Sequence, residues 1–595
     1  MVVWNVLQAI VRSLDTRMGL HYTCMERCGS GKPLHFQGFV IVTTSRTIAV
    51  IPARGGSRGI PRKNVRFLRG KPLIAWTIDT AKKCAAIDRV IVSTDDPEIA
   101  HVAEVHNCPV VMRPAALAAD DVPLDPVIHH AVCAVEEQEG SAFDTVITLQ
   151  PTSPLLSVDT LAAALEKFAQ GTMDTLISVV DDRHLSWTVK DGKYVPMYAQ
   201  RVNRQYLPAN FRETGGFVIA RRRHVTDRSR FGAEIDLFEI PHTQAIDIDD
   251  YMDWWLADKL LGRRRILLRA AGYEQIGLGH VYRVLMLASR LIDHELLIST
   301  DAGHTLGTKK VQDSFYPHAT FASDEEFFSL VKRFGPHIVI NDILDTDPAY
   351  VRSLKADGRF VVNFEDLGEG AWAADAVINA LYEADHPSPL FHFGKDYYCL
   401  RDEFHLLSPR EVTDEVKEVL ITFGGTDPND YTRRVLTILA GLPRKDFCVT
   451  VVTGLGYSHF DALQETVTGL DLKVEVLRDI RNISRYMHRA DIVFTSAGRT
   501  VFEVASLGTP IIVLAQNQRE LAHTFAREEN GIVNLGLGTR CSDTDIAAAF
   551  MRLRDDVVLR RRLSSTMRGH NLRSGMDNVL RVIFEKYEAA KGWEQ

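Results

Sequence analysis

The sequence predicts an α/β protein built from doubly wound, largely parallel sheets, and two observations carry this prediction. Apolar strand-like segments alternate with helix-like segments from residue 48 to about residue 261. The same alternation starts again after Arg263-Arg264-Arg265 and recurs in two further groups. With 595 residues, 46% of them apolar and 25% charged, the chain is long enough for three or four domains of ordinary globular composition.

The first group of segments predicts one domain over residues 47–262. Its predicted strands are 48–51, 89–93, 110–113, 145–149 and 175–180, and its predicted helices are 72–86 and 157–169. In such sheets ligands bind at the carboxyl ends of the strands, so residues that directly follow a strand are the first site candidates. Residues 1–46 show no strand–helix rhythm. We expect an irregular extension there, or a start site assigned too early.

The later segments predict two consecutive Rossmann-like halves. Strand 266–271 leads through the turn 277–280 into a helix with Val281, Val284, Leu285, Ala288 and Ile292 on one face. Further strands are predicted at 337–342 and 360–364, then at 419–424, 449–454 and 491–496. Two such halves predict a two-lobed architecture of the glycosyltransferase-B (GT-B) type, with lobes at 263–408 and 409–595. The linker after residue 262 is short, which favours fixed relative positions of the domains.

Composition excludes several classes of function. The net charge of −8 argues against nucleic acid as a partner, and no run of 18 apolar residues exists that could span a membrane. The eight cysteines are thinly spread, and the pair Cys24 and Cys28 has no second pair to complete a zinc site. Residues 1–46 also lack the pattern of a signal peptide. We therefore expect a cytoplasmic protein with reduced thiols.

A basic, glycine-rich loop directly follows the first predicted strand, in the stretch IAVIPARGGSRGIPRKN over residues 48–64. Glycines let backbone amides approach phosphate oxygens, and fixed cations neutralise a polyphosphate. The spacing is neither that of a Walker-type P-loop nor that of a dinucleotide fingerprint. The loop predicts a triphosphate site, and the alternative is a solvated basic loop. Its cations are Arg54, Arg58, Arg62 and Lys63, and Gly55, Gly56, Ser57 and Gly59 lie between them.

Asp247 and Asp249 are two residues apart on an apparent strand, which would point both carboxylates to one face, about 7 Å apart. Hard oxygen anions in that arrangement suit Mg²⁺, which also binds phosphate oxygens. The alternative interpretation is a solvated acidic edge. Together with the basic loop, the pair predicts a metal-bridged triphosphate.

Six ordered blocks over about 200 residues resemble the CMP-sialic acid synthetases, the acylneuraminate cytidylyltransferases. The blocks are the basic loop, Gly70-Lys71-Pro72-Leu73-Ile74, Val90-Ile91-Val92-Ser93-Thr94-Asp95-Asp96, Arg113-Pro114 with Leu117-Ala118-Ala119-Asp120, Leu149-Gln150-Pro151-Thr152-Ser153-Pro154, and Ile246-Asp247-Ile248-Asp249. The resemblance implies a Rossmann-like nucleotidyltransferase domain that joins CTP to a nine-carbon sugar acid and releases pyrophosphate.

The resemblance also implies roles for individual residues. Arg54, Lys63 and Asn64 would hold the triphosphate, and Ser93 and Asp95 would line the cytidine pocket. Gln150 would reach the sugar acid. Asp247 and Asp249 would bind Mg²⁺, with Asp249 also a candidate base for the attacking hydroxyl.

One segment departs from the family pattern. Where an asparagine–glycine pair is expected in the sugar-side loop, this chain has Thr214-Gly215-Gly216. Because that segment helps to choose the sugar, with Thr214 as its candidate substrate contact, pseudaminic or legionaminic acid fits at least as well as N-acetylneuraminate.

The second half resembles the UDP-sugar hydrolases of pseudaminic acid synthesis, through the run Ile276-Gly277-Leu278-Gly279-His280-Val281-Tyr282-Arg283. Glycines at a strand–helix turn admit a diphosphate to the helix N-terminus, and a histidine there suits a general base that activates water. We therefore predict nucleotide contact at Gly279 and catalysis by His280. The alternative for His280 is a structural histidine.

Later motifs complete this resemblance at Gly424, Gly425, Ser496 and Gly498, which follow predicted strands. Glu503 could accept hydrogen bonds from ribose hydroxyls, or could be an acid that complements the helix dipole. The sequence thus predicts a bifunctional enzyme of nonulosonic acid biosynthesis. A glycosyltransferase or an inactive nucleotide-sugar-binding module remains the alternative for the second half. The expected partners are CTP, a nine-carbon sugar acid, a UDP-sugar and a second copy of the chain in a homodimer.

Overall fold

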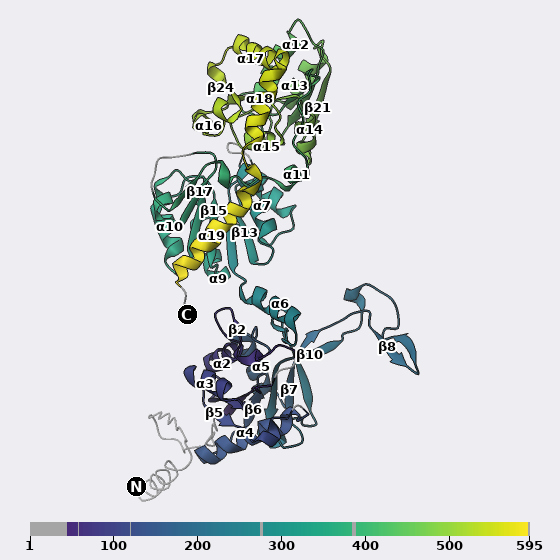
Figure 1. Ribbon diagram of the computed structural model, residues 1–595, viewed down its shortest axis with the longest axis vertical. Coiled ribbons are helices and arrows are strands. Elements are labelled where there is room, and N and C mark those ends of the chain that lie inside the picture. Colours follow the sequence, from purple (N-terminus) through teal and green to yellow (C-terminus); the bar gives the residue numbers. More distant parts are fainter. Residues whose placement is uncertain (1–44, 57–58, 120, 274–277, 383–387, 593–595) are drawn as a thin grey trace, which may run out of the picture. The chain divides into compact units, whose positions relative to one another are not determined.

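The computed structural model describes residues 45–56, 59–119, 121–273, 278–382 and 388–592. The chain divides into two compact units, one ending at Gly262 and one beginning at Arg263 (Figure 1). The expectation of an irregular extension over 1–46 falls almost wholly outside the described residues. No helix in the described ranges is both long and apolar enough to cross a membrane.

The first unit contains a seven-stranded sheet that confirms the predicted α/β fold. Strand β10 runs antiparallel to its neighbours β6 and β7, and all other pairs are parallel. In spatial order the strands are β11 (Ile235–Glu239), β7 (Thr175–Asp181), β10 (Phe211–Arg221), β6 (Thr145–Thr148), β1 (Thr47–Pro52), β4 (Arg89–Thr94) and β5 (Val110–Met112). The helices are α2 (Leu73–Lys83), α3 (Pro97–Val105), α4 (Leu124–Glu139), α5 (Val158–Gln170) and α6 (Tyr251–Leu261).

Strand β1 shows why this sheet is covered on both faces. Its residues alternate between two cores: Ala49 and Ile51 pack with α2, α3 and α5, whereas Ile48 and Val50 pack with α4. Because both faces are buried, the strand is apolar throughout, as expected for a central parallel strand. The carboxyl ends of β1, β4 and β6 therefore lie side by side and lead directly into the predicted motifs.

Two features of the first unit differ from the sequence analysis. The alternation over residues 245–249 predicts a strand, but the structure assigns these residues to no strand. The segment is instead fixed by Ile248, whose N–H donates to the carbonyl of Thr152 over 2.8 Å and whose side chain is buried. The second feature is a hairpin that the sequence analysis does not predict, formed by β8 (Trp187–Lys190) and β9 (Lys193–Pro196), which reaches away from the sheet (Figure 1). A small ribbon, β2 (Phe67–Leu68) with β3 (Lys71–Pro72), precedes α2.

The second unit has two wholly parallel sheets, as the two Rossmann-like halves require. The first sheet has the order β14 (His318–Phe321), β13 (Glu295–Asp301), β12 (Arg265–Ala270), β15 (Ile338–Asp342), β16 (Phe360–Phe364), β17 (Ala376–Asn379) and β18 (Phe391–Phe393). The second has the order β21 (Val474–Arg478), β20 (Cys448–Thr453), β19 (Glu418–Ile421), β22 (Ile492–Thr495), β23 (Ile511–Ala515) and β24 (Val533–Leu537).

Helices connect the strands of each lobe. In the first lobe they are α7 (Gly279–Arg290), α8 (Thr305–Gln312), α9 (Asp324–Phe334) and α10 (Pro348–Lys355), followed by α11 (Asp402–His405) between the lobes. In the second lobe they are α12 (Tyr431–Ala440), α13 (Phe460–Thr468), α14 (Ile483–Arg489), α15 (Thr500–Leu507), α16 (Gln518–Leu521), α17 (Asp543–Asp555) and α18 (Val557–Arg568).

The last helix, α19 (Gly575–Lys591), ties the two lobes together. It follows the second lobe in sequence, but Val579 and Ile583 pack into the core of the first lobe (Figure 1). One expectation about this lobe is wrong: Ile292 does not continue the apolar face of α7. The helix ends at Arg290, and the Ile292 side chain is 82% exposed.

Candidate functional site

A cavity of about 470 Å³ lies at the carboxyl ends of β1 and β6 in the first unit. It brings together residues that are up to about 200 positions apart in sequence, as expected at the edge of a parallel sheet. Among its lining residues are the predicted Arg54, Gly56, Lys63, Asn64, Gln150 and Asp249. Ser57 and Arg58 of the basic loop lie outside the described residues.

Lys63 links the basic loop to the acidic segment. Its ammonium group donates to the carbonyl of Ile248 and lies 3.5 Å from a carboxylate oxygen of Asp249. The Lys63 side chain is only 12% exposed, whereas that of Asp249 is 81% exposed. A buried cation beside an accessible carboxylate places both charges at the cavity wall. Asn64 supports the loop by donating from Nδ2 to the carbonyl of Arg54 over 3.0 Å.

The predicted cytidine residues take different positions. Asp95 accepts a hydrogen bond from the N–H of Gly55 over 3.3 Å, so it shapes the turn of the basic loop. Ser93 is fully buried in β4, and its carbonyl accepts from Nη2 of Arg113 over 2.6 Å. Neither Ser93 nor Asp95 lines the cavity itself, but Arg113 does. Burial lowers the pKa of Arg113, and the nearby charge of Arg54 adds to this effect.

Asp247 is the residue whose surroundings fit a metal ion best. One of its carboxylate oxygens, Oδ1, is buried and has no hydrogen-bond partner among the described residues. Burial raises the pKa of the Asp247 carboxyl, and the neighbouring Asp249 charge raises it further. A buried anion without a donor is costly unless a cation neutralises it. Within the described ranges no three His, Cys, Asp or Glu side chains gather to hold a metal, so an ion here would need phosphate oxygens as further ligands.

The sugar-side segment contains a close contact that the sequence does not reveal. Gly215 has φ +69°, and a Cβ atom on it would lie 2.7 Å from Oδ2 of Asp247 and 3.4 Å from Cδ of Gln150. Thr214, the predicted substrate contact, is instead fully buried, and its hydroxyl donates to Oγ of Ser178 over 2.9 Å. The Thr214 side chain therefore stabilises β10, while Gly215 makes room for Asp247 and Gln150.

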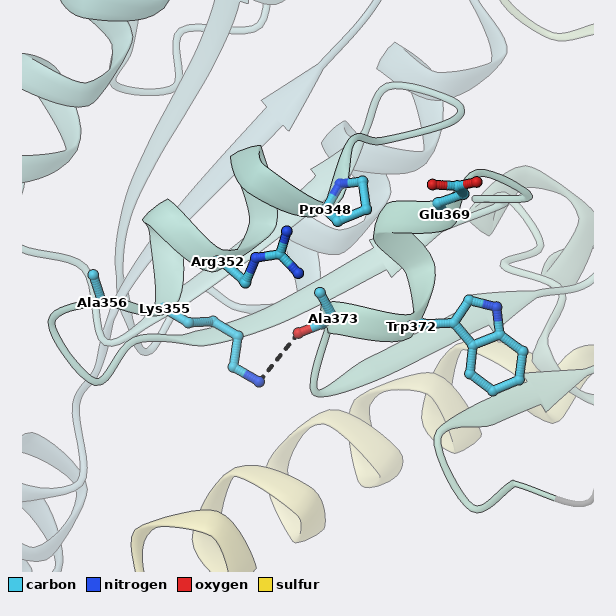
Figure 2. A pocket seen from close by; sticks show the side chains of 7 residues that line it. All are labelled: Pro348, Arg352, Lys355, Ala356, Glu369, Trp372 and Ala373. Atoms are coloured by element: carbon cyan, nitrogen blue, oxygen red, sulfur yellow. Dashed lines mark hydrogen bonds between the residues drawn. The ribbon is translucent and has the colours of Figure 1, made fainter.

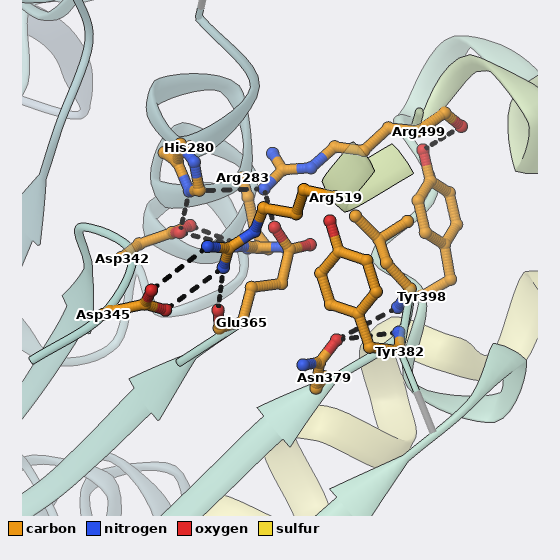
Figure 3. Close-up of polar contacts among 11 residues, drawn as sticks. His280, Arg283, Asp342, Asp345, Glu365, Asn379, Tyr382, Tyr398, Arg499 and Arg519 are labelled. Atoms are coloured by element: carbon orange, nitrogen blue, oxygen red, sulfur yellow. Dashed lines mark hydrogen bonds and ion pairs between the residues drawn. The ribbon is translucent and has the colours of Figure 1, made fainter. Parts of the chain in front are cut away.

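The second unit has its own cluster of polar side chains around His280, at the start of α7 (Figure 3). His280 is 5% exposed, and its Nδ1 lies 2.5 Å from Oδ1 of Asp342, at the end of β15. An ionised carboxylate only accepts hydrogen bonds, so Nδ1 carries the proton and Nε2 keeps its lone pair. Among the described residues, this dyad is the arrangement that best suits a general base in the second unit.

Arg283, one turn further along α7, keeps the carboxylate of the dyad, Asp342, ionised. Its Nε donates to Oδ2 of Asp342 over 2.7 Å, and its Nη1 donates to Glu365. Burial opposes ionisation of Asp342 and Glu365, but the charge of Arg283 outweighs it and lowers the pKa of both carboxyls. These side chains are almost fully buried, so the network has little freedom to rearrange.

Two arginines of the second lobe reach this cluster (Figure 3). Nη2 of Arg499 donates to Oε2 of Glu365 over 3.0 Å and lies 3.5 Å from Nδ1 of His280. Nη1 and Nη2 of Arg519 each lie 3.2 Å from an oxygen of Asp345, and Nη2 also donates to the carbonyl of Glu365 over 2.9 Å. The cluster of the first lobe is thus joined to the loop after β22 through Arg499 and to α16 through Arg519.

The predicted nucleotide residues of the second unit lie after β19, after β22 and at the start of α7. Gly424 follows β19 with φ +82°, and a Cβ on Gly424 or Gly425 would meet open space. Ser496 and Gly498 follow β22 and lead into α15. Gly279 begins α7, and a Cβ there would lie 3.0 Å from Nη1 of Arg499.

Glu503 already has a partner within the protein. Its two oxygens accept from Nε and Nη2 of Arg401 over 2.7 and 3.0 Å. Its ribose contact therefore stays a prediction that requires the carboxylate to be shared. A nearby carboxylate that the sequence analysis does not single out is Glu520, which accepts from the N–H groups of Ala497 and Gln516. Burial raises the pKa of Glu520 to about 7.

A further hollow of about 680 Å³ lies on the first lobe between α10 and the short 3₁₀ helix Glu369–Ala373 (Figure 2). Lys355 closes one side by donating to the carbonyl of Ala373 and pairing with Asp375. None of the predicted site residues lines this hollow.

Several residues of both sites are missing from the sequence analysis. Arg113 lies inside one of the six blocks of the first unit, and Arg283 ends the run that contains Gly279 and His280. Both could therefore have been proposed as site residues from the sequence. Asp342 lies at the predicted end of a strand, which is the one signal that could have found it. Glu365 and Arg499 become recognisable only when the lobes are seen together.

Comparisons with known proteins find similarities for both units of the chain. Residues 48–240 match the family model described as cytidylyltransferase, and residues 419–534 match the glycosyltransferase family 28 C-terminal domain. The CMP-N,N'-diacetyllegionaminic acid synthase of Legionella pneumophila is 34% identical over 227 residues, which are 36% of this chain and 96% of that protein.

Two further similarities are weaker or cover only part of the protein compared. Uncharacterized protein MJ1062 of Methanocaldococcus jannaschii is 28% identical over 285 residues, which are 44% of this chain and only 58% of that relative's length. The crystal structure of Acinetobacter baumannii MurG aligns over 54% of this chain and 99% of its own, with a TM-score of 0.41 and 16% identity.

Proposed function

Because the chain belongs to the cytidylyltransferase family through residues 48–240, we propose that its first unit transfers the cytidylyl group of CTP to a nine-carbon sugar acid. The observation that carries this proposal is the cavity that Arg54, Lys63 and Arg113 line together with Asp249. Cations and a carboxylate that line one cavity, with Lys63 beside Asp249, suit a triphosphate and the hydroxyl that attacks it.

In the proposed reaction, a hydroxyl oxygen of the sugar acid attacks the α-phosphorus of CTP. The bond from that phosphorus to the bridging oxygen breaks, and its electron pair leaves with pyrophosphate. Asp249 is the candidate acceptor of the hydroxyl proton, because its carboxylate is exposed at the cavity. Asp247 and Asp249 would hold Mg²⁺, which when bound neutralises charge on the triphosphate.

We infer that the acid is of the legionaminic or pseudaminic type rather than N-acetylneuraminate. The departure at residues 214–216 supports this choice, and so does the similarity to a synthase named for N,N'-diacetyllegionaminic acid. The test is a panel of these acids and N-acetylneuraminate with CTP and Mg²⁺, followed by pyrophosphate release. The expected result is the highest kcat/KM with a diacetylated acid. Equal or better turnover of N-acetylneuraminate would reject this choice, and no turnover of any acid would reject the activity.

For the second unit we propose hydrolysis of a UDP-sugar. The His280–Asp342 dyad supports it, because Nε2 of His280 can take a proton from water. The water oxygen bonds to the anomeric carbon, the bond from that carbon to the phosphate oxygen breaks, and its electron pair leaves with UDP. The water proton ends on His280.

A glycosyltransferase is the second candidate, favoured by the family 28 match over residues 419–534. The test is UDP release from a panel of UDP-linked acetamido sugars in the absence of any acceptor. A hydrolase releases UDP at the same rate with or without acceptors, and ¹⁸O from labelled water appears in the sugar. A transferase releases UDP rapidly only when an acceptor is present.

We also propose that the first unit pairs with a second copy of the chain through the β8–β9 hairpin. Three exposed apolar side chains share one face of it, since Trp187 and Val189 are two residues apart and Tyr194 is paired with Val189; they are 53%, 62% and 81% exposed, respectively. A two-stranded hairpin is marginally stable alone, and an exposed apolar face favours a partner that covers it.

A further inference from the structure

Arg499 lies where the predicted nucleotide loop of the second lobe meets His280. It is the last residue before α15, directly after Ser496, Ala497 and Gly498. The hydroxyl of Tyr398 donates to the Arg499 carbonyl over 3.1 Å, which fixes the backbone at this point (Figure 3). The side chain extends from this anchored position toward the first lobe.

The guanidinium group lies against the turn that begins α7. Nη2 donates to Glu365 over 3.0 Å and is 3.5 Å from Nδ1 of His280. On the other side, a Cβ on Gly279 would be 3.0 Å from Nη1 and 3.2 Å from Cζ. Only a residue without a side chain leaves this space, so Gly279 allows the guanidinium to lie beside His280.

Nη1 of Arg499 is the unusual atom of this group. It is buried, yet it has no hydrogen-bond partner in the part of the chain that the structure describes. The side chain as a whole keeps 18% exposure. A buried donor without an acceptor is unfavourable, and in a binding site this points to an acceptor that the ligand brings.

The need to neutralise the charge of Glu365 does not explain why the Arg499 side chain lies here. Glu365 is already paired with Arg283, and Arg499 uses only Nη2 for this contact. A planar guanidinium can donate to a carboxylate with one nitrogen and to a phosphate with another.

We propose that Nη1 of Arg499 donates to the β-phosphate of a bound nucleoside diphosphate and stabilises it as the leaving group. This inference rests on the proposed UDP-sugar hydrolysis. When the bond from the anomeric carbon to the phosphate oxygen breaks, the electron pair passes to that oxygen. Arg499 stays protonated and donates to the resulting diphosphate, while the water proton goes to Nε2 of His280.

The first test measures binding and needs no turnover. Calorimetry compares UDP with uridine on the whole protein and on Arg499→Ala. The expected result is UDP affinity weakened at least about tenfold with uridine affinity unchanged, because uridine has no phosphate to contact. Arg562→Ala, which removes an exposed arginine of α18, serves as the control and should bind both like the parent.

The second test measures how fast UDP is released as the leaving group. In Arg499→Ala, kcat for the UDP-sugar should fall on the order of 10²-fold, as when one donor to developing charge is removed. Added guanidinium ion should restore part of the rate, and Arg499→Lys should lie between the two. A fall in which guanidinium gives no rescue, with UDP and uridine affinity lowered equally, would show a structural role and overturn the inference.

The two proposals fail in different ways. If the parent protein binds UDP but releases none from any UDP-sugar, the hydrolase proposal is wrong, and a selective loss of UDP affinity in Arg499→Ala still supports the contact. If the parent hydrolyses a UDP-sugar and Arg499→Ala keeps its UDP affinity and rate, the hydrolase stands and the role of Arg499 is rejected.

Discussion

Asp342 decides which nitrogen of His280 can act as a base. In Asp342→Asn an amide takes the place of the carboxylate, so the Nδ1–H tautomer is no longer enforced. We expect UDP release from a UDP-sugar to slow on the order of 10²–10⁴-fold, with UDP affinity nearly unchanged. Steady-state kinetics and calorimetry on the same preparation measure both.

The buried pair with Arg283 makes a folding control necessary for this variant. Breaking a buried ion pair costs about 3–5 kcal/mol, so a lower Tm is expected and activity must be measured well below it. Asp313→Asn, at an exposed position of the same lobe, should change neither quantity. A folded Asp342→Asn variant with full activity would exclude Asp342 as the positioning residue.

The pKa of Asp247 gives the first unit a predictable pH dependence. Burial raises this pKa, and only the ionised carboxylate binds a metal, so Mg²⁺ affinity should increase as the pH rises through the raised pKa. The Mg²⁺ concentration for half-maximal pyrophosphate release should therefore be highest at acidic pH. Asp247→Asn should remove this dependence together with most of the activity. A half-maximal concentration that does not vary with pH would contradict the assignment.

Gly215 is predicted to be required for its lack of a side chain. Gly215→Ala brings a methyl group to within 2.7 Å of the Asp247 carboxylate at a φ of +69°. We expect at least a tenfold loss of kcat/KM for the sugar acid. Gly140→Ala is a matched control, since its φ is +64° but nothing lies within 4 Å. Both variants should lose roughly 1 kcal/mol of stability from backbone strain, and only Gly215→Ala should lose activity.

At the scale of secondary-structure elements, the β8–β9 hairpin leads to a testable prediction about the oligomeric state. If a second copy covers it, Trp187→Ser with Tyr194→Ser should shift the protein from dimer to monomer without unfolding the sheet, because neither residue belongs to the buried core. Sedimentation equilibrium measures the mass, and circular dichroism checks the fold. A parent protein that is monomeric at micromolar concentration would reject the pairing.

The elements also show how far sequence patterns reach. The apolar runs in β1, β6 and β15 are readily predicted as strands, because both of their faces are buried and flanking turns mark their ends. Residues 245–249 have a similar alternation but pair with no strand among the described residues, and a pattern of side chains does not reveal whether a partner exists. The hairpin escapes prediction for a different reason, because its strands have only four residues each and their apolar side chains Trp187, Val189 and Tyr194 are exposed.

In the candidate sites, too, features encoded by a local pattern are predictable and contacts between distant segments are not. A feature within one motif, such as His280 at the start of α7, follows from the local pattern of strand, turn and helix. The contact of Lys63 with Asp249 joins segments 186 positions apart and is not encoded by either segment alone. Contacts made by Arg499 with Glu365 depend on how two lobes meet, which no local pattern encodes. The burial of Thr214 depends on its hydrogen bond to Ser178 in a neighbouring strand.

At the scale of the whole molecule, the two proposed reactions belong to separate compact units with separate cores. One would free a sugar from UDP, and the other would activate a nine-carbon acid. A condensing step must lie between a freed hexose-sized sugar and such an acid, so one site does not pass its product directly to the other.

The two activities should therefore be separable by single substitutions in the intact chain. Asp247→Ala should abolish pyrophosphate release from CTP and leave UDP release from a UDP-sugar unchanged, because Asp247 belongs to the site of the first unit. His280→Ala should have the opposite effect. Each variant is assayed for both products in one preparation and compared with the parent. Loss of both activities in either folded variant would mean that the two units share a site or a conformational equilibrium, which is not expected from cores that are built independently.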